Sequence, residues 1–212
     1  MNEKDVARKI PLAQRLSMDA YTSSYFKEIY NYISVLYDNF LFNNNHTQKP
    51  VFVDTTKIEK ALRFADILSH SPVETHRTKS FEIISKIAAF HSDDPYFKMI
   101  GSAVINRLGI FAADNLISQG VHLPLDREIE SSIKKSFQKT SIDGLFFTDK
   151  QYELYQSLIT SNTLSFAGPT SMGKSFVINE YIKNIVFGNA KKNIVLIVPT
   201  RALISQSTLK LK

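Results

Sequence analysis

The sequence predicts an α plus α/β protein, in which an all-helical N-terminal domain precedes the beginning of an α/β phosphate-binding domain with an incomplete parallel sheet. Two observations carry this prediction. Apolar residues recur every three or four positions through most of residues 17–137, which is the spacing of amphipathic helices. Near the C-terminus, an apolar run leads into Gly-x-x-x-x-Gly-Lys-Ser, a helical pattern follows, and a second apolar run comes after it.

Two helices are expected in the first 70 residues. The first begins near Ser17, a candidate N-cap, and ends before Asn43. Its aromatic residues are interleaved with acidic as often as basic ones, so we interpret them as core residues rather than a base-stacking face. The second helix begins after Asp54 or Thr55 and stops before Pro72.

Three further helical patterns complete the first 140 residues. One covers about 74–90, and the next begins at Asp94-Pro95, a cap followed by a proline suited to the first helical position. The second of these patterns continues to Gly120, with Gly101 and Gly109 inside it marking either close helix packing or a break. After Pro124, apolar residues repeat every four positions through a more polar helix.

The domain boundary is expected at residues 140–144, where polar residues and a glycine interrupt the helical pattern. We therefore assign residues 1–140 to the helical domain, 141–147 to a linker and 148–212 to the first part of the phosphate-binding domain. Thr148 is a candidate N-cap for a helix that ends near Ile159. A strand at 163–167, a helix from 174 and a continuous apolar strand at 193–198 would then form one right-handed βαβ unit.

The Gly-Lys-Ser segment is the candidate functional site. Its glycines permit backbone angles and close approaches that a Cβ would block, so the loop could wrap a phosphate chain with its N–H groups. Lys174 would contact the β- and γ-phosphates, and the Ser175 hydroxyl would ligate Mg²⁺. The expected nucleotide-binding residues of this loop are Gly168, Pro169, Thr170, Ser171, Met172, Gly173, Lys174 and Ser175.

Composition and charge are consistent with such a ligand. The net charge is +6, and residues 146–212 hold eight Lys and Arg against three Asp and Glu, whereas residues 1–145 hold eighteen against seventeen. This excess beside the loop favours nucleotide and nucleic acid as partners. The chain has no cysteine, no apolar stretch long enough to span a membrane and no signal-peptide pattern, so a cytoplasmic location is expected.

Residues 145–212 resemble the N-terminal half of the first RecA-like domain of superfamily 2 helicases, the DEAD/DExH-box group. The segment 167–175 resembles motif I, 199–206 (Pro-Thr-Arg-Ala-Leu-Ile-Ser-Gln) resembles motif Ia, and Gln151 resembles the glutamine of the Q motif. The resemblance implies ATP and Mg²⁺ as cofactors, an adenine contact by Gln151 and a catalytic role for Lys174. It also implies contacts from Thr200 and Arg201 to the backbone of single-stranded DNA or RNA.

The family also needs an Asp-Glu pair after a later strand and a second RecA-like domain. Neither is found in these 212 residues, since Asp93-Asp94 precedes the loop and follows no apolar strand. The expectation is therefore an N-terminal fragment of an ATP-dependent helicase or translocase that is inactive alone. Two alternatives stay open: another kind of P-loop ATPase or kinase, and a helical protein-interaction or regulatory module attached to a motor.

Overall fold

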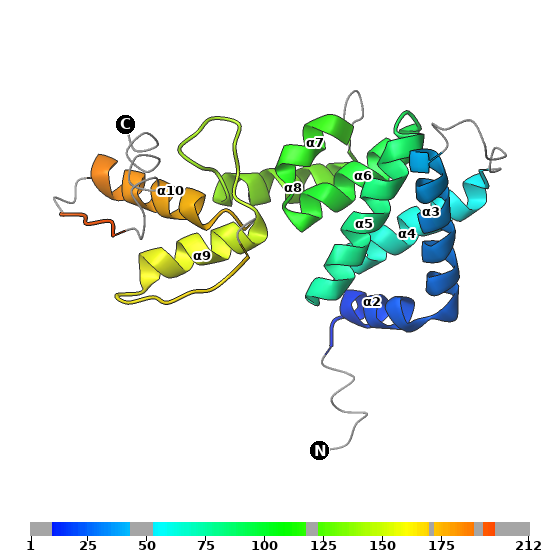
Figure 1. The fold of residues 1–212 in the computed structure, drawn as a ribbon, viewed down its shortest axis with the longest axis horizontal. Coiled ribbons are helices and arrows are strands. Elements are labelled where there is room, and N and C mark those ends of the chain that lie inside the picture. Colours follow the sequence, from blue (N-terminus) through cyan, green and yellow to red (C-terminus); the bar gives the residue numbers. More distant parts are fainter. Residues whose placement is uncertain (1–9, 43–52, 118–122, 170–171, 189–192, 198–212) are drawn as a thin grey trace, which may run out of the picture. The chain divides into compact units, whose positions relative to one another are not determined.

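A computed structural model describes residues 10–42, 53–117, 123–169, 172–188 and 193–197 of the chain. The chain divides into two compact units, residues 1–133 and 134–212 (Figure 1). The point of division lies within helix α8 (Leu125–Phe137), a few residues before the expected boundary at 140–144. Each unit is described separately below.

The first unit is a helical bundle around one apolar core. Its other helices are α2 (Leu12–Thr22), α3 (Ser24–Phe42), α4 (Thr55–Ser69), α5 (Glu74–His91), α6 (Pro95–Leu108) and α7 (Phe111–Ile117). Helix α4 packs against α2, α3, α5 and α6, and it contributes Ile58, Ala61, Leu62, Ala65 and Leu68 to the core. The predicted helical patterns place these residues on one face, and the structure confirms that this face is buried.

Side-chain caps begin two of these helices as the sequence predicts. The Asp54 carboxylate accepts hydrogen bonds from the N–H groups of Thr56 and Lys57 at 3.0 and 3.3 Å. Asp94 accepts one from the N–H of Phe97 at 2.7 Å, and Pro95 follows it at the first helical position. These bonds satisfy N–H groups that have no partner within the helix.

Two breaks differ from the expected helix limits. Ser17 is not an N-cap: it lies buried inside α2 and its hydroxyl donates to the Gln14 carbonyl at 2.8 Å. The expected first helix is instead divided at Ser23, whose extended backbone ends α2 and whose hydroxyl accepts from Phe26 N–H at 3.0 Å. The expected fourth helix is divided at Gly109, which adopts a left-handed φ of 75° that favours glycine.

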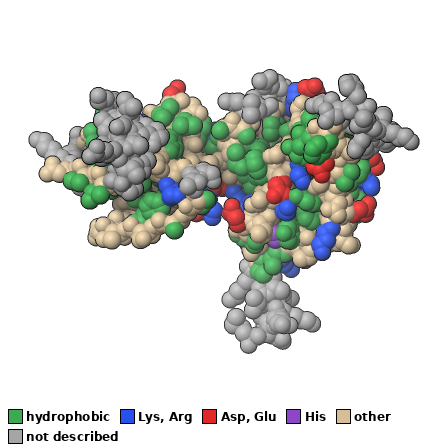
Figure 2. Space-filling model, viewed as in Figure 1, with side chains coloured by type: hydrophobic (Ala, Val, Ile, Leu, Met, Phe, Trp, Pro, Cys, Tyr) green, Lys and Arg blue, Asp and Glu red, His purple; other side chains and the backbone are tan. Residues whose placement is uncertain are grey.

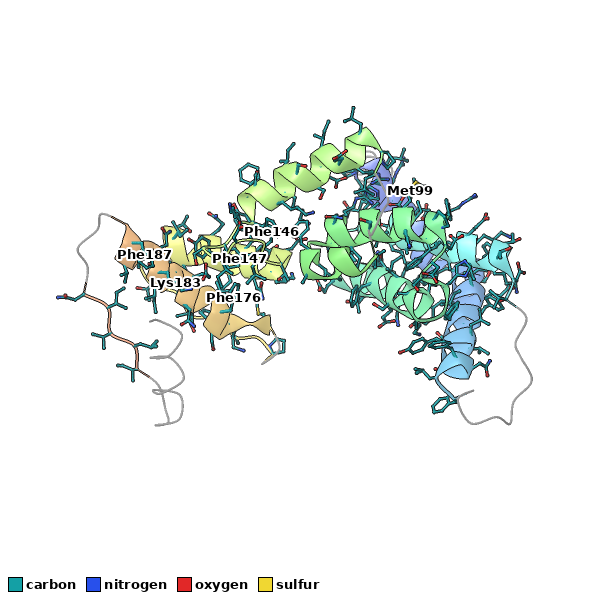
Figure 3. The ribbon with its side chains drawn as sticks, turned by 90° about the horizontal axis from the view of Figure 1, so that it is seen from above. Met99, Phe146, Phe147, Phe176, Lys183 and Phe187 are labelled. Carbon is teal, nitrogen blue, oxygen red and sulfur yellow. The ribbon has the colours of Figure 1, made fainter. Side chains whose placement is uncertain are left out.

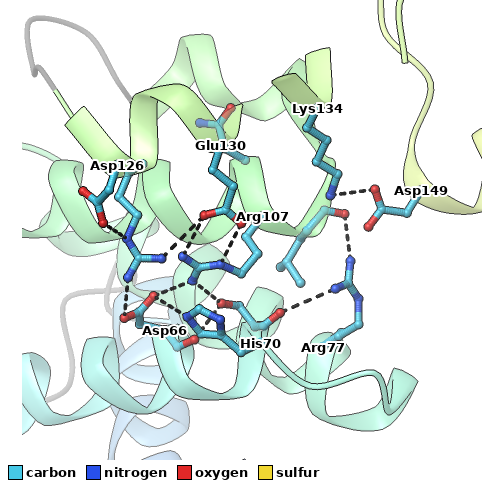
Figure 4. Close-up of polar contacts among 12 residues, drawn as sticks. Asp66, His70, Arg77, Arg107, Asp126, Glu130, Lys134 and Asp149 are labelled. Atoms are coloured by element: carbon cyan, nitrogen blue, oxygen red, sulfur yellow. Dashed lines mark hydrogen bonds and ion pairs between the residues drawn. The ribbon is translucent and has the colours of Figure 1, made fainter. Parts of the chain in front are cut away.

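A buried arginine joins three helices of the first unit (Figure 4). Arg107 of α6 contacts Asp66 of α4 at 2.7 Å and Glu130 of α8 at 3.3 Å, and it also donates to the Ser69 hydroxyl at 2.9 Å. Arg127 reaches the other Asp66 oxygen at 3.4 Å. Because the Arg107 side chain is only 7% exposed, its charge depends on these carboxylates for compensation.

The second unit contains helices α9 (Asp149–Thr160) and α10 (Lys174–Phe187) in its described part. They pack against each other through the small core of Phe147, Leu154 and Val177. The chain before α9 forms a tight turn in which Phe147 N–H donates to the Gln138 carbonyl at 2.7 Å. A single antiparallel bridge, Lys139 with Phe146, closes this turn.

The prediction of a RecA-like α/β domain with a parallel sheet is wrong. Across the described ranges the elements are helices, and neither 163–167 nor 193–197 forms a strand. A parallel strand requires neighbours to accept its N–H groups and to donate to its carbonyls, and these two segments form no ladder with each other. The described chain is therefore all-helical rather than α/β.

The apolar run 194–197 remains exposed, and its residues differ only in how much of each side chain is covered. Ile194 and Leu196 line a hollow of about 230 Å³ together with Ile182, Val186 and Phe187 of α10, whereas Val195 and Ile197 are 83% and 89% exposed. Ile194 and Leu196 are still 39% and 42% exposed, so the alternation gives one partly covered side and one open side. The continuous apolar pattern predicted burial of both faces, which the described residues do not provide.

The surface carries charges of both signs. On the face seen in Figure 2, acidic and basic side chains are interspersed with apolar ones rather than forming one continuous basic area. Among the described helices, none combines the length and apolar character that crossing a membrane would require.

Candidate functional site

The loop before α10 ends at Gly173, where the backbone conformation and the close approach of a neighbouring side chain both favour glycine. Gly173 adopts φ 78° and ψ 29° and precedes the first helical residue, Lys174. A Cβ at this position would lie 2.6 Å from Nε2 of Gln151, and the left-handed φ would strain any other residue. A side chain at position 168 would be tolerated more easily, because the atom nearest the Cβ position of Gly168 is the sulfur of Met172, which can move.

The N-terminal end of α10 has no side-chain cap, as is also the case for α2 and α5, whereas α4, α6 and α9 each have one. Within the described chain, the N–H groups of Lys174 and Ser175 make no hydrogen bond, while those of Phe176 and Val177 turn back to the Gly173 carbonyl. The end of a helix in this state carries a partial positive charge and free donors. It is chemically suited to an anion.

Lys174 folds back over the loop that precedes it. Its ammonium donates to the carbonyl oxygens of Gly168 at 2.5 Å and Pro169 at 2.8 Å. No described carboxylate pairs with it, so its charge is compensated only by neutral carbonyl groups. A phosphate would be a stronger acceptor than either carbonyl, because its oxygens carry negative charge that attracts the ammonium directly.

Gln151 connects α9 to the loop through both ends of its amide. Its Oε1 accepts from Thr148 N–H at 3.0 Å, and its Nε2 donates to the Met172 carbonyl at 3.1 Å. Thr148 Oγ1 accepts from Gln151 N–H at 3.4 Å, which completes a capping box and confirms Thr148 as the N-cap of α9. An adenine contact by Gln151 would require these amide bonds to open, and that role stays a prediction.

The remaining predicted residues are placed as follows. Ser175 is exposed in the first turn of α10, and its hydroxyl has no hydrogen-bond partner among the described residues. Pro169 and Met172 lie on the two sides of the loop and are joined by a backbone hydrogen bond of 3.2 Å. Thr170, Ser171, Thr200 and Arg201 lie outside the described residues.

Aromatic packing fixes the start of α10 against α9. Phe147 is fully buried between the two helices, with its ring centre 4.9 Å from that of Tyr155 and 5.7 Å from that of Phe176 (Figure 3). Val177, which is also buried, packs on the same cluster one turn into α10. The loop is therefore anchored on its C-terminal side by apolar contacts and at Met172 by Gln151.

Sequence reasoning missed a buried carboxylate further along α10. Glu180 is only 4% exposed, and its oxygens accept from the N–H and the hydroxyl of Ser141 at 2.7 and 2.9 Å and from Lys183 at 3.1 Å. Burial disfavours the charge, but the Ser141 and Lys183 hydrogen bonds outweigh it and hold the pKa of the Glu180 carboxyl below its ordinary value. A glutamate in the middle of an otherwise apolar helix face was the available signal.

Glu180 borders a hollow of about 260 Å³ that also includes Tyr155, Lys183, Asn184 and Phe187. None of the described residues of the loop 168–175 lines it. This hollow is therefore separate from the described residues of the loop 168–175, and Glu180 stabilises the turn at Ser141.

The residues present fit a nucleotide phosphate with its magnesium ion. Free N–H groups, a lysine without an acidic partner among the described residues and an exposed serine hydroxyl meet where α10 begins. The structure contains no group of three or more His, Cys, Asp or Glu side chains arranged for a metal in its described part. Ser175 is thus the described oxygen ligand that the loop itself offers to Mg²⁺.

Comparison of the chain with protein-family models, with curated proteins and with solved structures gives no match.

Proposed function

We propose that the chain binds ATP and Mg²⁺ through residues 168–175 at the N-terminal end of α10. The observation that carries this proposal is the helix end behind Gly173, where the N–H groups of Lys174 and Ser175 have no hydrogen-bond partner among the described residues and the ammonium of Lys174 lies beside them. Phosphate-binding loops in proteins combine the same three features: N–H donors, positive charge and a turn that depends on glycine.

Each described residue has a role in this proposal. The backbone N–H groups of Lys174 and Ser175 hold phosphate oxygens, and the Lys174 ammonium exchanges its two carbonyl partners for the β- and γ-phosphates. The Ser175 hydroxyl holds Mg²⁺, which when bound neutralises phosphate charge during phosphoryl transfer. Gln151 holds the loop at Met172.

We further propose that this nucleotide site belongs to an ATP-dependent helicase or translocase acting on single-stranded nucleic acid. The support for this part is the motif resemblance of 151, 167–175 and 199–206 and the excess positive charge of residues 146–212. The fold gives it no support, because the described chain lacks the sheet that this family would require.

Calorimetric titration of the full chain with ATP, in Mg²⁺ and in EDTA, tests the nucleotide proposal. We expect saturable one-to-one binding that is tighter in Mg²⁺, and Ser175→Ala should weaken binding in Mg²⁺ but leave the affinity in EDTA nearly unchanged. Because Ser175 is exposed, this substitution should preserve the fold. Absence of saturable binding in both conditions would contradict the proposal.

The nucleic-acid proposal is tested independently with Arg201→Ala. Loss of one phosphate contact should weaken single-strand binding about equally for different sequences and lower the salt slope by about one. An unchanged salt slope, with ATP affinity reduced instead, would place Arg201 in the nucleotide site and contradict its assignment to the nucleic-acid backbone.

A second candidate function, a protein-interaction module, is favoured by helix α8. Its apolar residues at every fourth position point to solvent, with exposed fractions of 73% for Leu125, 50% for Ile129 and 54% for Ile133. An exposed apolar row on a helix is typical of surfaces that enter a partner's groove. A photo-crosslinker at 129 should then form adducts in cells, while one at the neighbouring exposed Glu128 should not; equal labelling from both positions would contradict this function.

A further inference from the structure

The first unit contains a hollow that no part of the nucleotide proposal uses. It has a volume of about 300 Å³ and is lined by Tyr21 of α2, by Phe26, Lys27, Tyr30 and Asn31 of α3, and by Lys79 of α5. The half-buried rings of Tyr21 and Tyr30 supply most of its apolar surface, because Phe26 is only 4% exposed. Lysine and asparagine side chains supply hydrogen-bond donors.

Two of these donors have no partner in the part of the chain that the structure describes. The Lys27 ammonium and the Asn31 amide form no side-chain hydrogen bond or ion pair with any residue that the structure describes, and both residues are exposed. The third donor, Lys79, bonds to Glu82 at 2.7 Å and to the Tyr30 hydroxyl at 2.9 Å. Since an ammonium has three hydrogens, one remains for a ligand.

Positive charge exceeds negative charge around the hollow. Lys86 lies beside it, 3.3 Å from the Tyr30 hydroxyl, so Lys79 and Lys86 together meet the single carboxylate of Glu82. The hydrogen bonds to Glu82 and Tyr30 raise the pKa of Lys79 to about 12, which keeps its ammonium charged at neutral pH. The hollow therefore favours an anion.

The size and the rings decide what kind of anion fits. A volume of about 300 Å³ is at the lower end of the range for small-molecule pockets, roughly 300–1,000 Å³. The Tyr30 ring already contacts the ammonium groups of Lys79 and Lys86, whose nitrogens lie 4.4 and 4.6 Å from its centre. Successive bases of a nucleic-acid strand would need free ring faces for stacking, so a single small molecule fits these contacts better.

We infer that this hollow binds a small organic anion in which a phosphate or carboxylate is attached to a ring. The oxyanion would lie on Lys27, Asn31 and Lys79, and the ring would pack against the exposed part of Tyr21. The same chemistry is present in a nucleoside monophosphate and in an aromatic carboxylate, which the test below distinguishes.

The test uses the full chain carrying Lys174→Ala, which removes the lysine at the start of α10. Calorimetry or ligand-observed NMR with AMP, with 4-hydroxybenzoate and with inorganic phosphate should show saturable binding of one or both ring anions and weaker binding of phosphate. Adding Lys27→Ala should weaken the bound ring anion about tenfold, as loss of one charge-assisted contact requires. Asn31→Ala should weaken it to a smaller extent.

Lys98→Ala is the matched control, because Lys98 belongs to the same unit and does not line the hollow. It should change the affinity less than twofold. Failure of both ring anions to saturate, or equal affinity with and without Lys27 and Asn31, would overturn the inference. A short oligonucleotide that binds more tightly than AMP in a Lys27-dependent way would also overturn it, since the occupant would then be a strand.

Discussion

The amide nitrogen of Gln151 lies 2.6 Å from the point where a Cβ would be attached to Gly173, and it donates to the carbonyl of the residue before that glycine. The residue types at these two positions, 22 apart in the sequence, therefore depend on each other. The Gln151 amide reaches the loop only because Gly173 has no side chain. This relationship connects the capping box of α9 to the start of α10.

The first prediction compares the two glycines of the loop. Gly173→Ala should weaken ATP binding strongly and destabilise the second unit by about 1–2 kcal/mol, because alanine is strained at φ 78° and its methyl group would displace Gln151. Gly168→Ala should have a smaller effect, since the Met172 sulfur can move. Thermal melts measure the stability of the two variants, and titrations measure their ATP affinity. If both substitutions changed these quantities equally, the close contact of Gln151 with Gly173 and Met172 would not determine the loop conformation.

The second prediction separates two roles for Gln151. Gln151→Ala removes part of the capping box and the bond to Met172, so it should cost about 1 kcal/mol of stability and lower the affinities for ATP and GTP together. Gln156→Ala on the same helix is the control. A selective loss of ATP over GTP would instead support an adenine contact by Gln151.

The third prediction concerns Glu180 and pH. Because its pKa is lowered in the folded chain, the stability it contributes is present above the ordinary carboxyl value of 4.5 and is lost as the pH falls through the lower folded value. Glu180→Gln should cost about 2 kcal/mol at pH 7, from the loss of charge-assisted hydrogen bonds. The difference in the free energy of unfolding between the variant and the wild type should decrease as the pH is lowered. A difference that does not change with pH would show that packing alone explains the loss of stability.

The control for that series is Glu153→Gln, a charge removal on the exposed face of α9, where Glu153 pairs with Lys150 at 3.8 Å. Its effect on stability should be below about 0.5 kcal/mol, as for most exposed ion pairs.

The fourth prediction concerns the buried arginine of the first unit. Arg107→Ala should destabilise this unit by about 3 kcal/mol, because it leaves Asp66 and Glu130 without their central partner. Arg127→Ala, whose side chain is 25% exposed, should cost about 1 kcal/mol or less. Chemical denaturation of the two variants measures this difference. An equal loss of unfolding free energy in both would mean that the burial of Arg107 does not make its ion pairs more important than those of Arg127.

Local signals in the sequence predicted what local contacts decide. Asp94 and Thr148 were recognisable as N-caps, and Asp54 as one of two possible helix starts, because a cap bonds to N–H groups two or three residues away. The division at Ser23 was missed because the apolar pattern continues across it, and Ser17 offered an equally suitable cap. Gly109 was identified as a possible break, and its left-handed backbone confirms that possibility.

Contacts between residues far apart in the chain could not be predicted from the sequence. The apolar run 194–197 indicates a buried strand only if neighbouring strands exist, and the described chain contains none. The Glu180 contact joins positions 39 residues apart, so no spacing rule could find it. For the site, the loop motif predicted the turn at Gly173 and the free helix end, but not that the amide of Gln151 is occupied by Thr148 and Met172.

The most direct test of the phosphate site is the affinity of the wild-type chain and of Lys174→Ala for ATP and for ADP, measured by calorimetry in Mg²⁺ with Lys98→Ala as the control. If Lys174 contacts the β- and γ-phosphates, its loss should weaken ATP binding about tenfold or more and ADP binding less. Lys98→Ala should match the wild type. Equal ATP affinity in the wild type and in a folded Lys174→Ala variant would contradict the account.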